Sequence, residues 1–469
     1  MTILPGEADY RGRFVGLDVR VPCLDGQERP YINLDNAAST PPLASVRDTV
    51  NRFLDYYASV HRGTGFKSRL STEAYETARH RAMRFVGADP QAHTCVFAKN
   101  TTECINKIAR RLPLASDDVV LTTEMEHHSN DLPFRAVARV VHAGLHPDGR
   151  LDEDDFDRQL ARARGRVRLV AVTGASNVTG FLNPIHRLAE KAHAAGAAIL
   201  IDGAQLAPHR PIHIGVYGDP QAFDFVAFSA HKLYAPFGTG ALVGRRDVFE
   251  RGDPDQRGGG TVEIVTLDEV VWAGAPEREE AGSPNVVGAV ALGAAAVELT
   301  NIGMPAVAAH EARLTAYALE RLRTVPHLRI FGDREAARAA DRLGVIPFQI
   351  DGLSHFLVAA ILGYEHAIGV RSGCFCAHPY VLHLLGLSQV EAGAVRDRML
   401  AGDRREMPGM VRISFGLYNT AEEVEALVEA LQRIARHEHR GDYRQDTSTG
   451  EFVPIGWEPA GLGPFPFLD

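Results

Sequence analysis

Hydrophobic and polar positions follow two different periods along this chain from about residue 43 onwards. Apolar residues that recur every three or four positions predict helices, and short apolar or alternating runs predict strands. The predicted helices cover residues 72–86, 102–112 and 188–195, and the predicted strands cover residues 94–98, 119–122, 167–173 and 198–202. Strands that alternate with helices predict crossover connections and a mostly parallel sheet, and therefore an α/β fold.

The pattern changes after about residue 295. A long helix at 305–323 opens with proline, which the first turn of a helix tolerates, and an amphipathic helix covers 421–435. Strands are predicted at 328–331, 345–349 and 410–414, and a short strand near residue 31 runs into a turn. These elements predict a second, smaller α+β domain that includes the N-terminal segment.

The predicted domain boundaries follow from this change of pattern. A large domain covers 40–295, a discontinuous small domain covers 1–39 and 296–437, and residues 438–469 form an extended C-terminal arm without a core of its own. Residues 388–410 interrupt the small domain with a charged helical stretch. Its modest apolar stripe fits either a helical flap at the mouth of the site or a solvated surface excursion.

Composition narrows the class of protein. The chain has 469 residues, of which 45% are hydrophobic and 23% charged, as in ordinary soluble proteins. Its net charge is −9 and its basic residues are scattered, which argues against nucleic-acid binding. No signal peptide is apparent, and the longest small-apolar run, 286–299, is too short to span a membrane. Five cysteines argue against a disulfide framework, so a cytoplasmic protein is expected.

The most informative motifs place an acid and a lysine at the ends of two predicted strands. Asp202 follows the apolar run 197–201, and Lys232 follows a run that alternates from residue 223 to 227. Ligands of parallel sheets bind beyond the carboxyl ends of the strands. Lys232 could hold pyridoxal 5′-phosphate (PLP) as a Schiff base, and Asp202 could keep the pyridinium nitrogen protonated, so that the ring acts as an electron sink. An enzyme is therefore the leading interpretation.

Hydroxyl and imidazole groups near these strand ends could bind the phosphate. Thr101 and Thr102 open a helix, whose N-terminus is an anion site; an ordinary N-cap is the alternative. Ser229 and His231 lie close to Lys232 in sequence and could donate to the same phosphate.

Two further residues could contact the pyridine ring. His127 follows a strand, and its face could stack on the ring. A solvated loop or a metal site are the alternatives for His127, but a metal would need a third ligand that no spacing supplies, so no metal is expected. Asn177 could bond the ring hydroxyl, although an asparagine in a turn is usually structural.

A cysteine and an arginine in the second half of the chain could act on a substrate. Cys376 lies in a loop bounded by glycine and proline, near Arg371, a setting that favours the reactive thiolate; a small buried apolar residue is the alternative. Cys374 and Cys376 could also bind a metal or form a strained disulfide. Arg412 lies in a short strand and could clamp a substrate carboxylate with two hydrogen bonds, with a surface arginine as the alternative.

Ten motifs occur in an order that resembles the class V aminotransferase family of fold-type-I PLP enzymes, most closely the group II cysteine desulfurases and selenocysteine lyases. The resemblance covers roughly residues 30–435. The motifs are Leu-Asp-Asn-Ala-Ala at 34–38, Val-His-Arg-Gly at 60–63, Thr-Thr-Glu at 101–103, Met-Glu-His-His at 125–128, Ser-Asn-Val at 176–178, Asp-Gly-Ala-Gln at 202–205, Phe-Ser-Ala-His-Lys-Leu-Tyr at 228–234, Gly-Gly-Gly at 258–260, Glu-Ala-Gly-Ser-Pro-Asn at 280–285 and Arg-Ser-Gly-x-x-Cys-Ala at 371–377.

The resemblance implies a large domain with a mainly parallel seven-stranded sheet, a homodimer, and a role for each matching residue. Lys232 is implied as the Schiff-base lysine and proton shuttle, and Cys376 as the sulfur-accepting nucleophile. The remaining roles are ring contacts by Asp202, Gln205 and His127, phosphate contacts by Thr102, Ser229 and His231 with Thr101 beside them, a contact of Ser283 with the phosphate of the other subunit, and substrate binding by Arg412 with Asn177 and Arg371.

The implied reaction converts L-cysteine to L-alanine and leaves a persulfide on Cys376, with selenocysteine as an alternative substrate and a sulfur-acceptor protein as a partner. A C–S lyase, aminotransferase or epimerase in which Cys376 is a bystander remains an alternative. A partner protein without catalysis is disfavoured because the main cofactor residues are present. Two features depart from the family: Cys374-Phe375, which is more like the desulfurase domain of molybdenum-cofactor sulfurases, and the longer segment 388–410.

Overall fold

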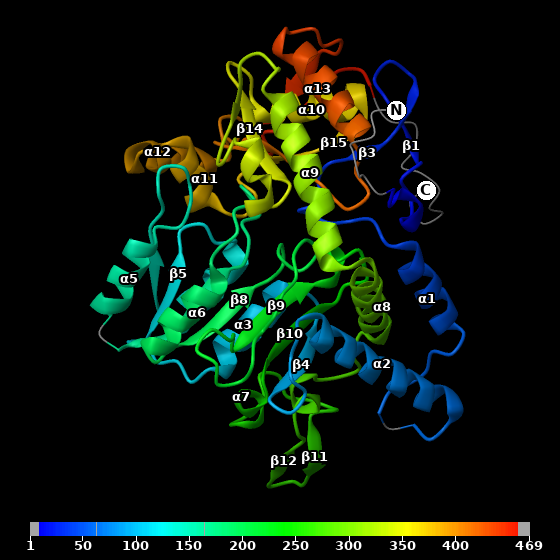
Figure 1. Cartoon of the computed structure of the whole chain (residues 1–469), viewed down its shortest axis with the longest axis vertical. Coiled ribbons are helices and arrows are strands. Elements are labelled where there is room, and N and C mark those ends of the chain that lie inside the picture. Colours follow the sequence, from blue (N-terminus) through cyan, green and yellow to red (C-terminus); the bar gives the residue numbers. More distant parts are fainter. Residues whose placement is uncertain (1–8, 62, 164, 458–469) are drawn as a thin grey trace. The chain divides into compact units, whose positions relative to one another are not determined.

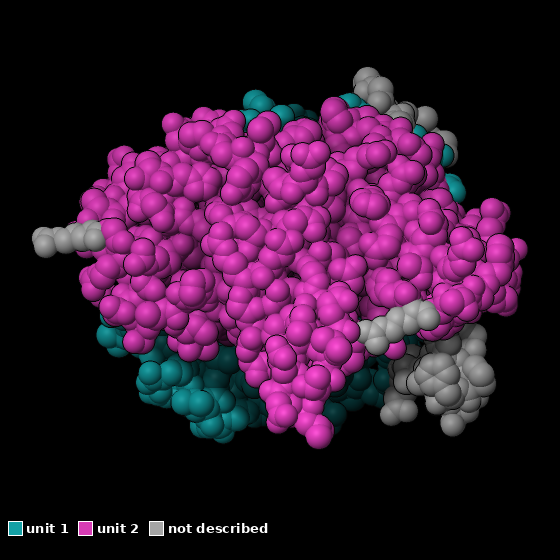
Figure 2. Space-filling model, turned by 90° about the horizontal axis from the view of Figure 1, so that it is seen from below, with its two compact units in different colours: residues 1–12, 16–38, 310–469 teal, residues 13–15, 39–309 magenta. Residues whose placement is uncertain are grey.

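A computed structural model describes residues 9–61, 63–163 and 165–457 of the chain (Figure 1). Arg62 of the Val-His-Arg-Gly motif and the end of the C-terminal extension, 458–469, lie outside these residues. The chain divides into two compact units (Figure 2). Unit 1 comprises 1–12, 16–38 and 310–469, and unit 2 comprises 13–15 and 39–309.

Unit 2 contains the predicted seven-stranded sheet. Its strand order is β4-β10-β9-β8-β7-β5-β6, in which β10 is antiparallel to both neighbours and the other pairs are parallel. The fold class predicted from the sequence is therefore confirmed. The strands are β4 (His93–Ala98), β5 (Val119–Thr123), β6 (Arg139–Ala143), β7 (Val167–Thr173), β8 (Ala198–Asp202), β9 (Phe225–Ser229) and β10 (Gly240–Arg245), and a separate hairpin is formed by β11 (Val262–Val265) and β12 (Val270–Trp272).

The central strands β5, β7, β8 and β9 are buried almost throughout, because helices cover a parallel sheet and leave its strands apolar on both sides. Helix α3 packs on β9 and β10, α6 packs on β7 and β8, and α2 packs on β4 and β10. The helices of this unit are α1 (Ala44–Leu54), α2 (Phe66–Phe85), α3 (Thr101–Arg111), α4 (Leu132–Arg135), α5 (Glu153–Arg162), α6 (Ile185–Ala194), α7 (Arg246–Glu250) and α8 (Val286–Ile302).

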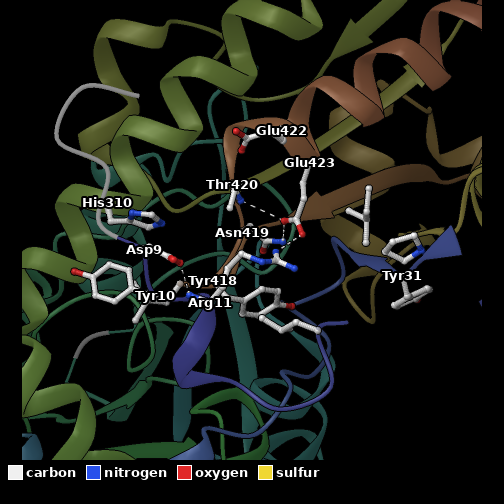
Figure 3. A pocket seen from close by; sticks show the side chains of 14 residues that line it. Asp9, Tyr10, Arg11, Tyr31, His310, Tyr418, Asn419, Thr420, Glu422 and Glu423 are labelled. Carbon is white, nitrogen blue, oxygen red and sulfur yellow. Dashed lines mark hydrogen bonds and ion pairs between the residues drawn. The ribbon is translucent and has the colours of Figure 1, made fainter. Parts of the chain in front are cut away.

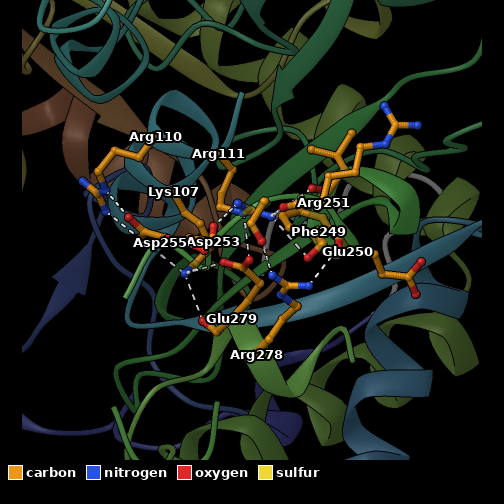
Figure 4. A network of polar contacts seen from close by, with 12 residues as sticks. Lys107, Arg110, Arg111, Phe249, Glu250, Arg251, Asp253, Asp255, Arg278 and Glu279 are labelled. Atoms are coloured by element: carbon orange, nitrogen blue, oxygen red, sulfur yellow. Dashed lines mark hydrogen bonds and ion pairs between the residues drawn. The ribbon is translucent and has the colours of Figure 1, made fainter. Parts of the chain in front are cut away.

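A buried ion-pair network holds the C-terminal half of α3 (Figure 4). Lys107 Nζ lies 3.2 Å from Asp255 Oδ2 and 3.3 Å from Glu279 Oε2, and it donates to the Glu279 carbonyl at 2.9 Å. Arg111 Nε lies 2.8 Å from Glu279 Oε1. Removing one partner of such a pair leaves a buried charge uncompensated, so the network fixes the helix whose other end carries Thr101 and Thr102.

Unit 1 is built on an antiparallel sheet in the order β13-β14-β17-β16. Apolar residues of α9, α10 and α13 form one core with this sheet. The strands are β1 (Arg20–Pro22), β2 (Glu28–Pro30), β3 (Ile32–Asn33), β13 (Leu328–Ile330), β14 (Val345–Ile350), β15 (Ile368–Gly369), β16 (Arg371–Gly373), β17 (Met410–Ser414), β18 (Tyr443–Gln445) and β19 (Phe452–Pro454). The helices are α9 (Met304–Leu322), which begins in unit 2, α10 (His355–His366), α11 (His378–Leu385), α12 (Gln389–Leu400) and α13 (Ala421–Ala435).

A cavity of about 480 Å³ in unit 1 lies where the N-terminal segment meets the start of α13 (Figure 3). Arg11 Nη1 pairs with Glu423 Oε1 at 2.6 Å, and Glu423 also accepts hydrogen bonds from the Asn419 amide and the Thr420 backbone. Glu423 thus completes the N-terminal cap of α13 and ties the N-terminal segment to unit 1. The described lining of this cavity contains none of the predicted site residues.

Helix α12 confirms the helical stretch predicted within 388–410. It begins with a capping box between Ser388 and Glu391. None of its side chains is buried, and Val390 and Leu400 are 82% and 80% exposed. The other two residues of the apolar stripe seen in the sequence, Val395 and Met399, are partly buried.

The C-terminal extension differs from the arm without a core that the sequence predicts. Strands β18 and β19 form a hairpin, and Glu365 of α10 accepts hydrogen bonds from the backbone of Arg440 and Gly441 and from the Tyr443 hydroxyl. The rings of Tyr443 and Trp457 contact Tyr364. These contacts join residues about 80 positions apart, which no local sequence pattern can indicate.

Within the described residues, no single helix is long and apolar enough to cross a membrane. Helices α8 and α9 meet that criterion only as a pair bent by 76°.

Candidate active site

Asp202 and Lys232 lie at the same edge of the large sheet, at the carboxyl ends of two neighbouring strands. Asp202 ends β8, and Lys232 ends the 3-10 turn η3 (Ala230–Lys232) that follows β9. Asp202 is 4% exposed. Burial raises the pKa of its carboxyl, against the opposing effects of a 2.9 Å hydrogen bond from the Ala204 backbone and of the Lys232 charge. A buried acid in this environment is stabilised by a cationic partner, and a protonated pyridine nitrogen fits that requirement. Gln205, which follows in the same turn, is also buried.

The hydroxyl groups predicted to bind phosphate gather at the start of α3. Ser229, the last residue of β9, accepts a 2.7 Å hydrogen bond from the Thr101 backbone, and the two side-chain hydroxyls lie 2.7 Å apart. Both residues are buried, whereas Thr102 is exposed. The Asn100 side chain caps the helix by accepting from the Glu103 backbone. Thr101 and Ser229 therefore fix the position of the helix N-terminus, and Thr102 carries the accessible hydroxyl.

His127 is held by a residue that the sequence did not single out. The backbone N–H of Ser129 donates to His127 Nδ1 at 3.1 Å, and the Ser129 hydroxyl lies 3.0 Å from the same nitrogen. Thr102 Oγ1 lies 2.7 Å from Ser129 Oγ. The sequence feature that could have identified Ser129 is a hydroxyl two positions after a candidate histidine, because serine hydroxyls in turns commonly hydrogen-bond to neighbouring residues.

His231 is fixed through its backbone to the segment before α1. Its carbonyl accepts from the Thr40 backbone and hydroxyl, both at 3.0 Å, and its ring Nδ1 lies 3.3 Å from Ser39 Oγ. Burial and then the charge of Lys232 lower the pKa of the His231 ring to about 4. The imidazole is therefore neutral at physiological pH and contributes a dipolar N–H rather than a charge.

Glu126 is a second residue that the sequence did not identify. It is buried and accepts hydrogen bonds from Thr123 Oγ1 (2.7 Å), Asn130 Nδ2 (2.7 Å) and the Thr173 backbone (3.1 Å). Thr173 lies opposite Asp202 in the β7–β8 register. Burial raises the pKa of Glu126 to about 8. An uncharged acid therefore joins the ends of β5 and β7 next to the predicted cofactor site.

Asn177 lies buried in the turn that follows β7. Ser176 Oγ in that turn accepts from the backbones of Val178 and Thr179, at 3.1 and 3.2 Å. The turn is therefore rigid, and it belongs to the same unit as Asp202 and Lys232.

Ser283 has a different environment. It is exposed and borders a cavity of about 470 Å³, whose described lining includes none of the other predicted cofactor residues. Glu280 anchors this motif by accepting from Arg79 (2.8 Å), Tyr75 (2.6 Å) and the Phe97 backbone (2.6 Å). The motif is thus tied firmly to α2 and β4, with Ser283 directed to the surface.

In unit 1, Asp35 joins the two predicted substrate arginines. Asp35 Oδ1 lies 2.9 Å from Arg412 Nη2, and its Oδ2 lies 2.9 Å from Arg371 Nη2. The arginines are paired in the register of β16 and β17. Arg412 is 3% exposed, and its guanidinium lies 4.8 Å from the centre of the Phe375 ring. The alternative of a surface arginine is therefore wrong for Arg412, while Arg371 is exposed.

The loop that carries Cys376 has an unusual backbone. Phe375 and Cys376 both have positive φ angles, 54° and 55°, which non-glycine residues adopt at an energetic cost that is typical of functional sites. Cys376 is exposed, whereas Cys374 is buried and its thiol donates to the Pro408 carbonyl at 3.0 Å. Burial raises the pKa of Cys374 to about 12. The two thiols differ in access, and neither forms a disulfide.

The described residues contain no group of three or more histidine, cysteine, aspartate or glutamate side chains that could hold a metal ion. The predicted site residues fall into two sets. The cofactor set lies in unit 2, and Cys376, Arg371 and Arg412 lie in unit 1.

Comparisons with known proteins give consistent matches over most of the chain. The family model described as Aminotransferase class-V matches residues 32–427. A probable cysteine desulfurase of Streptomyces coelicolor is 36% identical over 452 residues, which are 92% of this chain and 99% of that protein. A cysteine desulfurase of Klebsiella pneumoniae is 36% identical over 87% of this chain and 94% of that protein. The solved structure of the cysteine desulfurase CsdA (S-sulfonic acid) from Escherichia coli has a TM-score of 0.75 and 30% identity, covering 92% of this chain and 98% of that chain.

Proposed function

Because the chain belongs to the class-V aminotransferase family, we propose that it is a PLP-dependent cysteine desulfurase, which converts L-cysteine to L-alanine and receives the sulfur on Cys376. The family resemblance stated from the sequence is confirmed. The observation that carries the proposal is the Cys376 loop, where an exposed thiol is held on a strained backbone. The loop follows β16, which pairs with β17, the strand that contains Arg412.

The residues of unit 2 fit PLP. When bound, PLP supplies an electron-withdrawing ring that stabilises negative charge on the substrate α-carbon. Lys232 would hold the cofactor aldehyde covalently, Asp202 would pair with the ring nitrogen, and His127 would lie against the ring face. The start of α3 offers backbone N–H groups and the Thr102 hydroxyl to the phosphate.

Each residue has a defined task in the reaction. The guanidinium of Arg412 binds the substrate carboxylate, and Asp35 orients it through the 2.9 Å contact to Nη2. The amine of Lys232 takes the proton from the α-carbon and returns one to the product. The Cys376 thiolate attacks the sulfur of the substrate cysteine.

The atoms and electrons of the transfer balance without a further reactant. A bond forms between Cys376 Sγ and the substrate sulfur as the bond from that sulfur to the β-carbon breaks. The electron pair of the broken bond stays on the β-carbon, which takes up a proton to give alanine. The persulfide then rests on an exposed cysteine, where a sulfur-acceptor protein could receive it.

Replacing Cys376 by alanine tests the proposal. Incubation of the wild-type protein with L-cysteine should give alanine and a persulfide that mass spectrometry places on Cys376. The C376A protein should lose the persulfide and most of the alanine, because no thiolate is left to accept the sulfur. The matched control is C374A, which should still form the persulfide because the Cys374 thiol is buried and bonded to Pro408.

Two results would point to another reaction. Full production of alanine and sulfide by C376A would make Cys376 a bystander. Formation of pyruvate or of a keto acid by the wild type would identify a C–S lyase or an aminotransferase instead.

A homodimer is part of the proposal. The β11–β12 hairpin exposes Ile264, Val265, Val270 and Val271, and Leu267 at its tip is fully exposed. Adjacent exposed apolar side chains of this kind mark interaction surfaces. A second copy of the chain would cover them, and the exposed Ser283 would then be available to the partner's cofactor phosphate.

Charge placed on the hairpin should weaken the dimer. We expect L267D to lower the dimer fraction measured by sedimentation velocity at micromolar concentration, because a carboxylate is costly to bury at an apolar contact. The control is V216D, at an exposed valine elsewhere in unit 2, which should sediment as the wild type does. A monomeric wild type, or an unchanged L267D dimer, would contradict this assignment of the interface.

A further inference from the structure

Three side chains in unit 2 form a continuous hydrogen-bonded chain. Thr102 Oγ1 lies 2.7 Å from Ser129 Oγ, and Ser129 Oγ lies 3.0 Å from His127 Nδ1. Thr102 belongs to the first turn of α3, and Ser129 lies in the 3-10 turn η2 (His128–Asn130) after β5. These hydrogen bonds therefore connect the start of α3 to the His127 imidazole through Ser129.

The backbone of Ser129 determines which nitrogen of His127 carries the proton. The Ser129 N–H donates to Nδ1 at 3.1 Å, and a backbone N–H cannot accept. Nδ1 must therefore be an acceptor without a proton, so the neutral ring carries its proton on Nε2.

The hydrogen bond between the Thr102 and Ser129 hydroxyls can run in either direction. A threonine or serine hydroxyl has one proton to donate. If Thr102 donates to Ser129, Ser129 is free to donate to His127 Nδ1. If Thr102 donates instead to an anion at the start of α3, its oxygen becomes an acceptor, and the Ser129 hydroxyl can turn from His127 to Thr102. An anion at the helix start thus changes the hydrogen bonding of the histidine.

We propose that Ser129 is a positioning residue that holds His127 as the Nε2–H tautomer and couples its Nδ1 to anion binding by Thr102. The coupling rests on the proposed PLP site, since the cofactor phosphate is the anion expected there. His127 Nδ1 therefore accepts a second hydrogen bond, from the Ser129 hydroxyl, only while the phosphate position at the start of α3 is empty.

The experiment observes His127 directly, in the full-length protein after removal of the cofactor, with inorganic phosphate as the probe. Histidine ¹⁵N signals distinguish a protonated from an unprotonated ring nitrogen, and a H127Q protein assigns the signal. We expect the Nε2–H tautomer in the wild type. Adding phosphate should shift the Nδ1 signal, because Nδ1 loses the hydrogen bond from the Ser129 hydroxyl.

Two variants isolate the relay. The phosphate-dependent shift should disappear in S129A and persist in S129T, which retains a hydroxyl. T102V, at an exposed position, should abolish the shift as well and serves if S129A does not fold. An Nδ1–H tautomer in the wild type, an absent phosphate response in the wild type, or an unchanged response in S129A would each overturn the proposal. None of these signals depends on turnover, so they are separate from the C376A test of desulfurase activity.

Discussion

Replacing Lys232 by alanine should abolish covalent attachment of the cofactor and lower turnover by at least ~10³-fold, since a general acid–base group alone contributes about 10²–10⁴-fold. Lys232 ends the turn after β9, and its charge reaches the buried Asp202 carboxyl. Alanine removes both the amine that would bond the cofactor and the group that would move the α-proton. The measurement is the visible absorption of the purified protein with PLP, before and after borohydride reduction, together with alanine formation from cysteine.

A lysine elsewhere in unit 2 provides the control for this experiment. Lys67 is exposed in α2 and donates to the Asp55 carbonyl, so K67A should keep the borohydride-sensitive band and the activity. A K232A protein that still formed that band would refute the assignment of Lys232.

Replacing Glu126 by glutamine should change how the free energy of unfolding depends on pH, because glutamine does not titrate. In the folded protein burial raises the pKa of Glu126 to about 8, against an ordinary value of 4.5. Between these values the folded chain keeps a proton that the unfolded chain has lost. Stability therefore falls as pH rises through this window, by up to ~1.4 kcal/mol per pH unit.

The free energy of unfolding of E126Q minus that of the wild type should rise by about 1.4 kcal/mol per pH unit between pH 5 and pH 8 and level off above pH 8. Urea denaturation at four pH values in this range measures the difference.

The control for Glu126 is an exposed glutamate with the opposite shift. Contacts with Ser388 lower the pKa of Glu391, so this carboxyl is ionised in both states above pH 5. The difference between E391Q and the wild type should therefore stay constant from pH 5 to pH 8. A constant difference for E126Q as well would show that Glu126 is ionised in the folded protein.

Local sequence pattern was sufficient for the central strands of the large sheet. β7 and β8 have the bounds that their apolar runs predict, because a strand covered on both faces must be apolar throughout. α2 begins at Phe66, earlier than predicted, since the residues that its first turns bury, Ser68 and Ser71, are polar and give no apolar helical period. β10 was not predicted, and it is the strand that makes the sheet mixed.

The placement of Asp202 beside Lys232 followed from the strand-end rule. Parallel strands bring their carboxyl ends to one edge, so Asp202 and Lys232 could be placed together from the sequence, and β8 and β9 are indeed neighbours. The same rule does not predict which serine hydroxyl is the hydrogen-bond partner of Thr101 and which is the partner of Thr102. That Thr101 is buried against Ser229 while Thr102 faces Ser129 depends on the rotation of α3 in the fold.

The sequence by itself determined the α/β class and the family, and it predicted which residues carry reactive groups, because these depend on periodicity and on motifs that are contiguous in the chain. Only the tertiary structure decided which side chains pair with these residues, and which further residues are buried beside them. Asp35 meets Arg412 across 377 positions, Glu126 meets the Thr173 backbone across 47 positions, and the pKa of Glu126 is raised by burial. Burial and pairing are properties of atoms brought close in space, so they arise only when the chain is folded.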